Sequence, residues 1–168
     1  MGRAVKRCAW AIREPLLSYH DKEWGTPLHD ERKLFEFLIL EGAQAGLSWE
    51  TILRKRDAYR KAFSGFDPNK VARYTARDVS RLMKDAGIVR NRAKIGSTIE
   101  NAKVFLKVQK EHGSFDSYLS GFTDAAVLSR DLKHRGMRFV GPTIVESFME
   151  ATGRLDHHEN QCFRRGRP

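Results

Sequence analysis

Apolar residues recur along the chain at helical spacing, and no alternating stretch is longer than residues 137–140. The strongest apolar run covers residues 30–45 and begins at Asp30, a residue type that often caps a helix. Leu34 and Leu38 mark its inner face, but Phe37 makes the run apolar nearly all round. This pattern predicts a helix in the centre of the molecule.

Polar caps and glycines mark the ends of further predicted helices. Ser48 is a candidate cap for a helix that begins near Trp49 and turns a cationic face outward. Thr75-Ala76-Arg77-Asp78 resembles a capping box that opens a short helix through Leu82, and Gly87 is a candidate helix stop. Helices are also expected over 92–112, 115–120, 127–135 and 142–151. The predicted fold class is all-α.

Composition is typical of a soluble globular protein with one core. The chain has 168 residues, of which 40% are hydrophobic and 31% charged, and no stretch reaches the length of a membrane span. No sustained apolar segment precedes Glu14, so a secretory signal is not expected. We therefore expect a cytoplasmic protein whose two cysteines are free or bound to a metal rather than joined in a disulfide.

The formal net charge of +10 favours a polyanionic partner, most often a nucleic acid. A merely solvated basic surface is the alternative. The basic residues gather in four clusters: 54–61, 90–94, 133–138 and 164–167. Clustering favours nucleic-acid binding but does not identify the substrate.

Residues 85–89 form a tight turn between two predicted helices. Backbone N–H groups at such a turn can hold a DNA phosphate, with Arg90, Arg92 and Lys94 beside it. Only Gly87 stands where such a hairpin usually has two glycines. An ordinary helical hairpin is therefore the alternative.

The two cysteines lie near opposite ends of the chain, and each has a histidine nearby. Cys8 precedes His20, and His158 precedes Cys162. If the four converge, thiolates and imidazoles suit a closed tetrahedral zinc site. Two buried thiols or one terminal disulfide would also fit the spacing.

Aromatic and acidic residues cluster in the segment 19–25, which we expect to be loop-like. Glu41 interrupts the apolar run of the central helix, where an unpaired carboxylate is costly. It either belongs to a local hydrogen-bond network or faces a pocket, for which Trp10 and Trp49 could form walls. Core packing is the alternative role for each tryptophan.

Several motifs together resemble the 3-methyladenine DNA glycosylase I family, in the family's order and over nearly the whole chain. They are Cys8-Ala9-Trp10, Tyr19-His20-Asp21-Lys22-Glu23-Trp24-Gly25, Leu40-Glu41-Gly42-Ala43-Gln44-Ala45-Gly46-Leu47-Ser48-Trp49, Asp85-Ala86-Gly87-Ile88-Val89-Arg90-Asn91-Arg92, Arg138-Phe139-Val140-Gly141-Pro142-Thr143-Ile144 and the pair His158 and Cys162. No single motif would be specific, but the combination is.

The resemblance implies a helix–hairpin–helix glycosylase that acts on alkylated double-stranded DNA, releases free 3-methyladenine and leaves an abasic site. It implies a monomeric, monofunctional enzyme of bacterial type, associated with the nucleoid. One structural zinc would join the termini through Cys8, His20, His158 and Cys162. The unit would span 1–168, with a helix–hairpin–helix lobe at roughly 48–135 and a zinc-containing lobe from 1–47 and 136–168.

The resemblance also implies roles for the pocket and for the DNA-facing residues. Glu41 would be the catalytic carboxylate that accepts hydrogen bonds from the flipped base, with Tyr19 beside it. Trp49 would stack on the base, and Trp10 and Trp24 would complete the lining. The wedge would be Leu47 next to Gly46, and the phosphate contacts would come from Gly87, Arg90, Arg92 and Lys94.

Some positions depart from the family's pattern. Leu16-Leu17 occupies the place where a second pocket tyrosine can occur, and the segment 115–132 is short. Glu146 replaces a frequent aromatic, and His157 is a competing metal ligand. Two alternatives follow: a DNA-binding protein of the same fold that recognises damage without turnover, and a hydrolytic metal site that includes Glu41 or Asp21.

Overall fold

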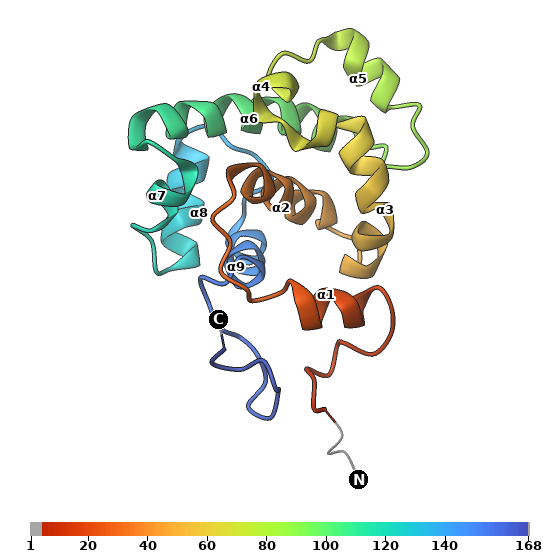
Figure 1. Cartoon of the computed structure of the whole chain (residues 1–168). Helices are drawn as coiled ribbons and strands as arrows, with labels where there is room; N and C mark the ends of the chain where they lie inside the picture. Colours follow the sequence, from red (N-terminus) through yellow and green to blue (C-terminus); the bar gives the residue numbers. More distant parts are fainter. Residues whose placement is uncertain (1–4, 168) are drawn as a thin grey trace.

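The computed structural model describes residues 5–167, and these contain helices but no strand (Figure 1). The helices are α1 (Leu16–Lys22), α2 (Glu31–Gln44), α3 (Trp49–Ala62), the 3₁₀ turn η1 (Ser64–Phe66), α4 (Pro68–Val71), α5 (Ala76–Leu82), α6 (Arg92–His112), α7 (Phe115–Leu119), α8 (Ala125–His134) and α9 (Pro142–Ala151). The all-α prediction is confirmed. Residues 1–4 and 168 of the expected unit lie outside the described residues.

The central helix of the fold is α2, as its apolar pattern predicts. Every residue from Leu34 to Ala43 is buried, and the Asp30 side chain caps the helix by accepting a hydrogen bond from the Lys33 N–H. α2 packs against α3, α6, α7 and α9 (Figure 1). The two-lobe division remains a prediction, and α2 contacts helices on both sides of its boundary at residue 48.

The predicted caps of the outer helices are present. Ser48 accepts from the Thr51 N–H at the start of α3, and Thr75 and Asp78 form the capping box of α5. α6 begins at Arg92 and ends at His112, as expected from its apolar spacing. Local sequence signals therefore place these helices to within a few residues.

Two local predictions are corrected by the structure. Tyr19 lies on α1 rather than in a loop, because a helix of only two turns leaves too few positions for a periodic pattern. The helix before the hairpin ends at Leu82, as predicted, so Gly87 is not the residue that ends it. A Cβ at Gly87 would lie 2.7 Å from the Ala58 Cβ, so this glycine permits close packing on α3.

The cationic face of α3 is not wholly outward. Arg56 is buried and pairs with Glu36 at 2.6 Å and with Glu23 at 2.9 Å. The sequence pattern could not reveal these partners, which come from α2 and from the residue that follows α1. Arg56 thus joins α3 to α2 rather than facing solvent.

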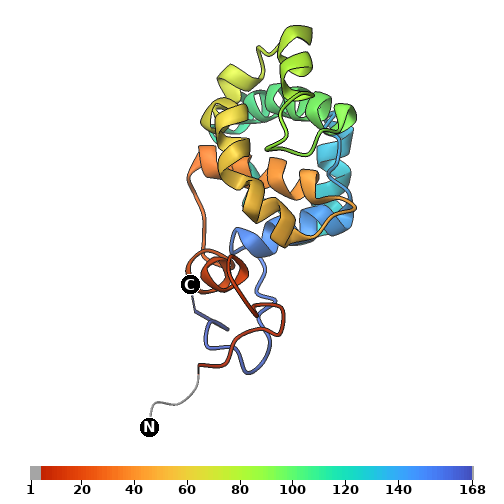
Figure 2. The same cartoon turned by 90° about the vertical axis from the view of Figure 1, so that its right-hand side faces the viewer.

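The two terminal segments, residues 5–15 and 156–167, lie side by side next to α1 and α9 (Figures 1 and 2). The Phe163 N–H donates to the Lys6 carbonyl at 2.9 Å, and the Ala9 N–H donates to Glu159 at 2.7 Å. These contacts join the ends of the described chain. Across residues 5–167, every helix is too short or too polar to cross a bilayer.

Candidate functional site

A cavity of about 340 Å³ opens between α1, the C-terminal end of α2, the start of α3 and α9. Its lining consists of Trp10, Leu16, Tyr19, Trp24, Glu41, Gln44, Ser48, Trp49, Glu50, Ser147 and Glu150. All five residues predicted to bind or act on a base are in this set. The structure therefore brings them together from four separate segments of the chain.

Aromatic rings form most of the cavity wall. The Tyr19 ring lies 5.5 Å from the Trp49 ring between centroids, and Trp10 lies 5.0 Å from Trp24 at 87°. The buried indole N–H of Trp49 has no hydrogen-bond partner within the described part of the chain. Since buried donors are nearly always paired, this N–H is a candidate donor to a bound molecule.

Glu41 is the buried acid of the cavity, with 3% of its surface exposed. Burial, and secondarily the nearby charge of Glu150, raises the pKa of Glu41 to about 8. Across residues 5–167 no positive charge or hydrogen bond offsets this increase. Its position near the C-terminal end of α2 also disfavours a negative charge, because the helix dipole is negative there. The site is thus suited to a ligand that supplies positive charge.

Glu150 and Ser147, both on α9, were not predicted as cavity residues. A sequence signal for Glu150 exists: it is the single acid within the apolar run Phe148-Met149-Glu150-Ala151, just as Glu41 is a single acid at the end of an apolar run of α2. His157 Nδ1 contacts the Glu150 carboxylate. Burial raises the pKa of Glu150, and the bond to His157 opposes that effect. Leu16 provides an apolar wall at the place expected for a second tyrosine.

Next to the cavity, Cys8, His20 and Cys162 form a group of potential metal ligands. Their ligand atoms all lie within 4.8 Å of one another, and Cys162 Sγ is 3.3 Å from His20 Nε2. The Glu159 N–H donates to Cys8 Sγ, and the Arg164 N–H donates to Cys162 Sγ, each at 3.4 Å. Both cysteines are free, so the disulfide alternative is wrong.

His158 lies beside this group, and its ring is 5.6 Å from the His20 ring. Its Nε2 is buried and lacks a hydrogen-bond partner among the described residues, whereas Nδ1 bonds Asp156 at 2.7 Å. A Cβ at Gly25 would lie 2.4 Å from the His158 ring, so glycine is needed there. His157 contacts Glu150 and is not part of the cysteine group.

The structure also bears on a hydrolytic metal site at Glu41 or Asp21. Among the described residues, the possible ligand groups are the cysteine group and Glu146 with Glu150 and His157, and neither includes Glu41. Asp21 bonds Arg7 at 2.7 Å and His20 at 2.8 Å. Asp21 therefore orients a ligand of the cysteine group rather than forming a second site.

The predicted DNA-facing residues lie at two places. Gly46 has a positive φ of 78°, and Leu47 after it is 39% exposed. Arg90 and Arg92 are exposed at the hairpin that joins α5 to α6. Lys94 differs from expectation: its ammonium donates to the carbonyls of Ala43 and Ala45 at the end of α2.

The chain is similar to known proteins over nearly its whole length. The family model described as methyladenine glycosylase matches residues 10–127 and 123–165. DNA-3-methyladenine glycosylase 1 of Escherichia coli is 42% identical, covering 94% of this chain and 96% of the relative. DNA-3-methyladenine glycosylase of Haemophilus influenzae is 40% identical, covering 93% of this chain and 96% of the relative.

Solved structures give the same result. 3-Methyladenine DNA glycosylase I from Staphylococcus aureus superposes with a TM-score of 0.92 at 38% identity, covering 99% of this chain and 100% of that chain. A variant of 3-methyladenine DNA glycosylase I in complex with 3-methyladenine superposes with a TM-score of 0.90 at 39% identity, covering 95% of this chain and 97% of that chain. From these matches and the shared helical fold, we conclude that this chain belongs to the methyladenine glycosylase family.

Proposed function

We propose that this protein is a DNA glycosylase that hydrolyses the N-glycosidic bond of 3-methyladenine in alkylated double-stranded DNA. The observation that carries the proposal is the cavity in which Glu41, a buried acid with no cationic partner among residues 5–167, faces indole and phenol rings. Relatives of the same family bear this activity in their names. The released products are free 3-methyladenine and an abasic site.

The positive charge of the substrate explains this choice of side chains. Methylation at N3 makes the adenine cationic, and faces of Trp49 and Tyr19 attract a cation through their ring electrons. A bound cation beside Glu41 favours the ionised carboxylate, which accepts hydrogen bonds from the base. Neutral adenine has no positive charge to interact with the ring faces or with the ionised Glu41, so the cavity selects the damaged base.

The bond that breaks joins C1′ of the sugar to N9 of the purine. Its electron pair stays with the purine and neutralises the positive charge, while a water oxygen bonds to C1′ and the water loses a proton. The cavity lining contains no lysine among the described residues, which fits a hydrolase without a lyase step. Because the leaving group is already activated by its charge, binding it in the flipped position accounts for much of the catalysis.

The base must leave the duplex before it enters the cavity. Extrusion costs a few kcal/mol and is least costly for a damaged base. Leu47 is exposed beside the cavity residue Ser48, which suits a wedge that fills the gap left in the duplex. Arg90 and Arg92 at the hairpin supply positive charge for the phosphates.

The residues at the termini fit a structural zinc ion. Two thiols and an imidazole form the ligand group, and the buried Nε2 of His158, which has no hydrogen-bond partner in the described part of the chain, is available as a fourth donor. Asp21 and Asp156 hold the other ring nitrogens of the two histidines, as carboxylates do at many metal sites. Zinc bound by Cys8, His20, His158 and Cys162 would tie the terminal segments together and leave no position for a reacting water.

The activity is tested by measuring release of free 3-methyladenine from methylated duplex DNA at low salt. We expect release by the wild-type protein and a large loss in Glu41→Ala and Trp49→Ala. No release by the wild type would contradict the proposal. Tight binding to alkylated duplex without release would instead support a damage-recognising DNA-binding protein.

The short segment at 115–132 does not by itself favour that alternative. It forms α7 and part of α8, and Phe115, Leu119 and Leu128 are buried in the core. The segment is therefore packed despite its length.

The zinc proposal has a separate test. Metal analysis of the purified protein is expected to give about one zinc per chain, and Cys162→Ser is expected to lower stability more than it lowers base binding. Metal-free protein that retains normal stability would contradict it. This result would leave the glycosylase proposal intact, because zinc takes no part in the reaction.

A further inference from the structure

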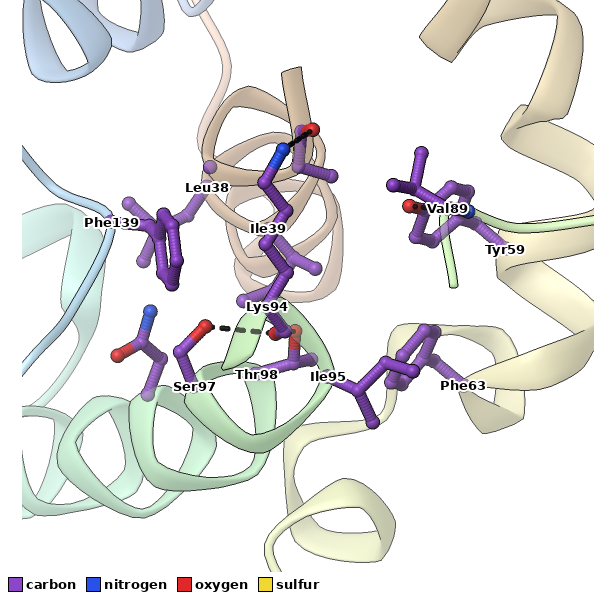
Figure 3. Close-up of a pocket in the computed structure, with 13 residues that line it drawn as sticks. Leu38, Ile39, Tyr59, Phe63, Val89, Lys94, Ile95, Ser97, Thr98 and Phe139 are labelled. Carbon is purple, nitrogen blue, oxygen red and sulfur yellow. Dashed lines mark hydrogen bonds between the residues drawn. The ribbon is translucent and has the colours of Figure 1, made fainter. Parts of the chain in front are cut away.

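Lys94 lies on α6, just after the hairpin, but its charge is directed into the protein. Figure 3 shows the side chain extending from α6 across a small hollow between α2, α3 and α6 toward the end of α2. The ammonium donates to the Ala43 carbonyl at 2.9 Å and to the Ala45 carbonyl at 2.5 Å. It has no carboxylate partner in the described chain, and burial lowers its pKa.

The two acceptors are carbonyls at the end of α2, which have no partner within the helix. The chain then turns through Gly46 into Leu47, and Ser48 caps α3. Within this turn, the Leu47 N–H donates to the Gln44 carbonyl at 2.7 Å, and the Gln44 side chain donates to the Leu47 carbonyl at 3.2 Å. These bonds fix the shape of the turn, but neither joins it to another helix. Lys94 provides that connection.

Lys94 thus connects the Leu47 turn to the start of α6, where Arg92 is the predicted phosphate contact. Arg92 is the first residue of α6, two positions before Lys94, and Asn91 caps the helix by accepting from the Lys94 N–H at 3.0 Å. Arg92 and Lys94 therefore share the rigid first turn of one helix. A phosphate held at the hairpin and a side chain inserted by the turn would have a fixed separation.

We propose that Lys94 is a positioning residue that holds the Leu47 turn in register with the DNA-binding hairpin, so that backbone binding and base extrusion occur together. This inference rests on the proposed glycosylase function. It replaces a direct phosphate contact as the role of Lys94. The half-buried Lys94 ammonium, bonded to two helix-end carbonyls, is also stabilised by the negative end of the α2 dipole.

The proposal predicts an effect that depends on the form of the DNA. Lys94→Met removes the charge and both hydrogen bonds, so single-turnover base release from methylated duplex is expected to fall about tenfold or more. Release from methylated single-stranded DNA is expected to stay unchanged, because no wedge is needed there. Binding of free 3-methyladenine, followed by tryptophan fluorescence, is also expected to stay unchanged. Lys107→Met, an exposed lysine on the same helix, is the matched control.

A double-mutant cycle with Leu47→Ala makes the test specific. If Lys94 acts through the Leu47 turn, the double variant is no slower on duplex than the slower single variant. Lys94→Arg, which keeps a cationic donor, is expected to recover part of the duplex activity. Lys94→Gln is measured in parallel, in case Lys94→Met does not unfold cooperatively.

Several results would overturn the inference. One is that Lys94→Met and Lys94→Gln slow base release from duplex and single-stranded DNA equally. Another is that the slowing by Lys94→Met and that by Leu47→Ala multiply in the double variant. The third is that base release from duplex does not slow at all. If the wild type itself releases no base from any DNA, the glycosylase proposal fails instead. The two failures are therefore distinguishable.

Discussion

Two buried carboxylates on α2, Glu36 and Glu41, have opposite surroundings. Glu36 is 5% exposed and Glu41 is 3% exposed, so burial does not distinguish them. Glu36 pairs with Arg56 at 2.6 Å and Arg60 at 2.9 Å, both supplied by α3. Glu41 faces the aromatic cavity, and nothing in the described chain supplies it with a positive charge.

The difference separates a structural acid from a functional one. A buried charge is expensive, and a permanent partner offsets the cost at Glu36. At Glu41 the cost persists in the free protein and is relieved only when a cationic ligand enters. The same helix therefore contains one acid that joins α2 to α3 and one that is kept for a positively charged base.

The largest expected effect is on catalysis. Glu41→Gln keeps the shape of the side chain but removes its charge, so we expect kcat/KM for release of 3-methyladenine to fall by about 100- to 1000-fold. Glu36→Gln should change kcat/KM far less when measured below its unfolding temperature. Similar losses in the two variants would remove the distinction between the two acids.

The second effect is on stability and concerns the paired acid. Glu36→Gln leaves the buried Arg56 guanidinium with a weakened partner, and we expect the free energy of unfolding to fall by about 3 kcal/mol. Denaturant titration at pH 7 measures it. A stability equal to that of the wild type would show that the pair is not needed to hold α3 against α2.

Glu41→Gln is expected to change stability in the opposite direction. The pKa of Glu41 is about 8 in the folded protein against an ordinary 4.5, so the wild type loses stability as pH rises from 4.5 to 8. The neutral variant lacks this loss. The free energy of unfolding of Glu41→Gln, relative to that of the wild type, should gain nothing from this effect below pH 4.5. Above pH 4.5 the difference should grow by about 1.4 kcal/mol per pH unit and reach about 3 kcal/mol at pH 7. Parallel stability curves for the two proteins would contradict the raised pKa.

The smallest effect concerns Glu150. Since kcat/KM reports the free enzyme, it should rise with pH until Glu41 is ionised near pH 8. Glu150→Gln removes a nearby negative charge, so the rise should move to lower pH by a fraction of a unit. Glu146→Gln, an exposed acid on the same helix, is the control. A shift to higher pH in Glu150→Gln would contradict this electrostatic coupling.

The sequence predicted most of the fold because its long helices bury strong apolar faces and carry clear caps. α2 was located by its apolar periodicity and its cap Asp30, and α6 by its apolar spacing. The cavity residues Glu41, Tyr19 and Trp49 lie together, as expected. Periodicity could not find α1, since two turns contain too few apolar positions. The helix α1 beside the cavity therefore needed the three-dimensional structure.

The partners of charged side chains were also beyond the sequence. Arg56 and Lys94 belong to basic clusters that suggest solvent or DNA, but each meets acceptors from a distant helix. Glu150 lines the cavity because α9 packs against α2, a tertiary contact without a local signal. The charge pattern thus predicted a nucleic acid as the binding partner of the whole protein. It did not predict which acceptor each basic side chain contacts.

The central claim is that Glu41 and the surrounding rings prefer a positively charged purine. The most direct measurement compares binding of the 3,9-dimethyladeninium cation and neutral 9-methyladenine at pH 7, followed by tryptophan fluorescence in the wild type and Glu41→Gln. We predict that the wild type binds the cation at least about tenfold more tightly and that Glu41→Gln loses most of this preference. Equal affinity of the wild type for the two purines would contradict the account.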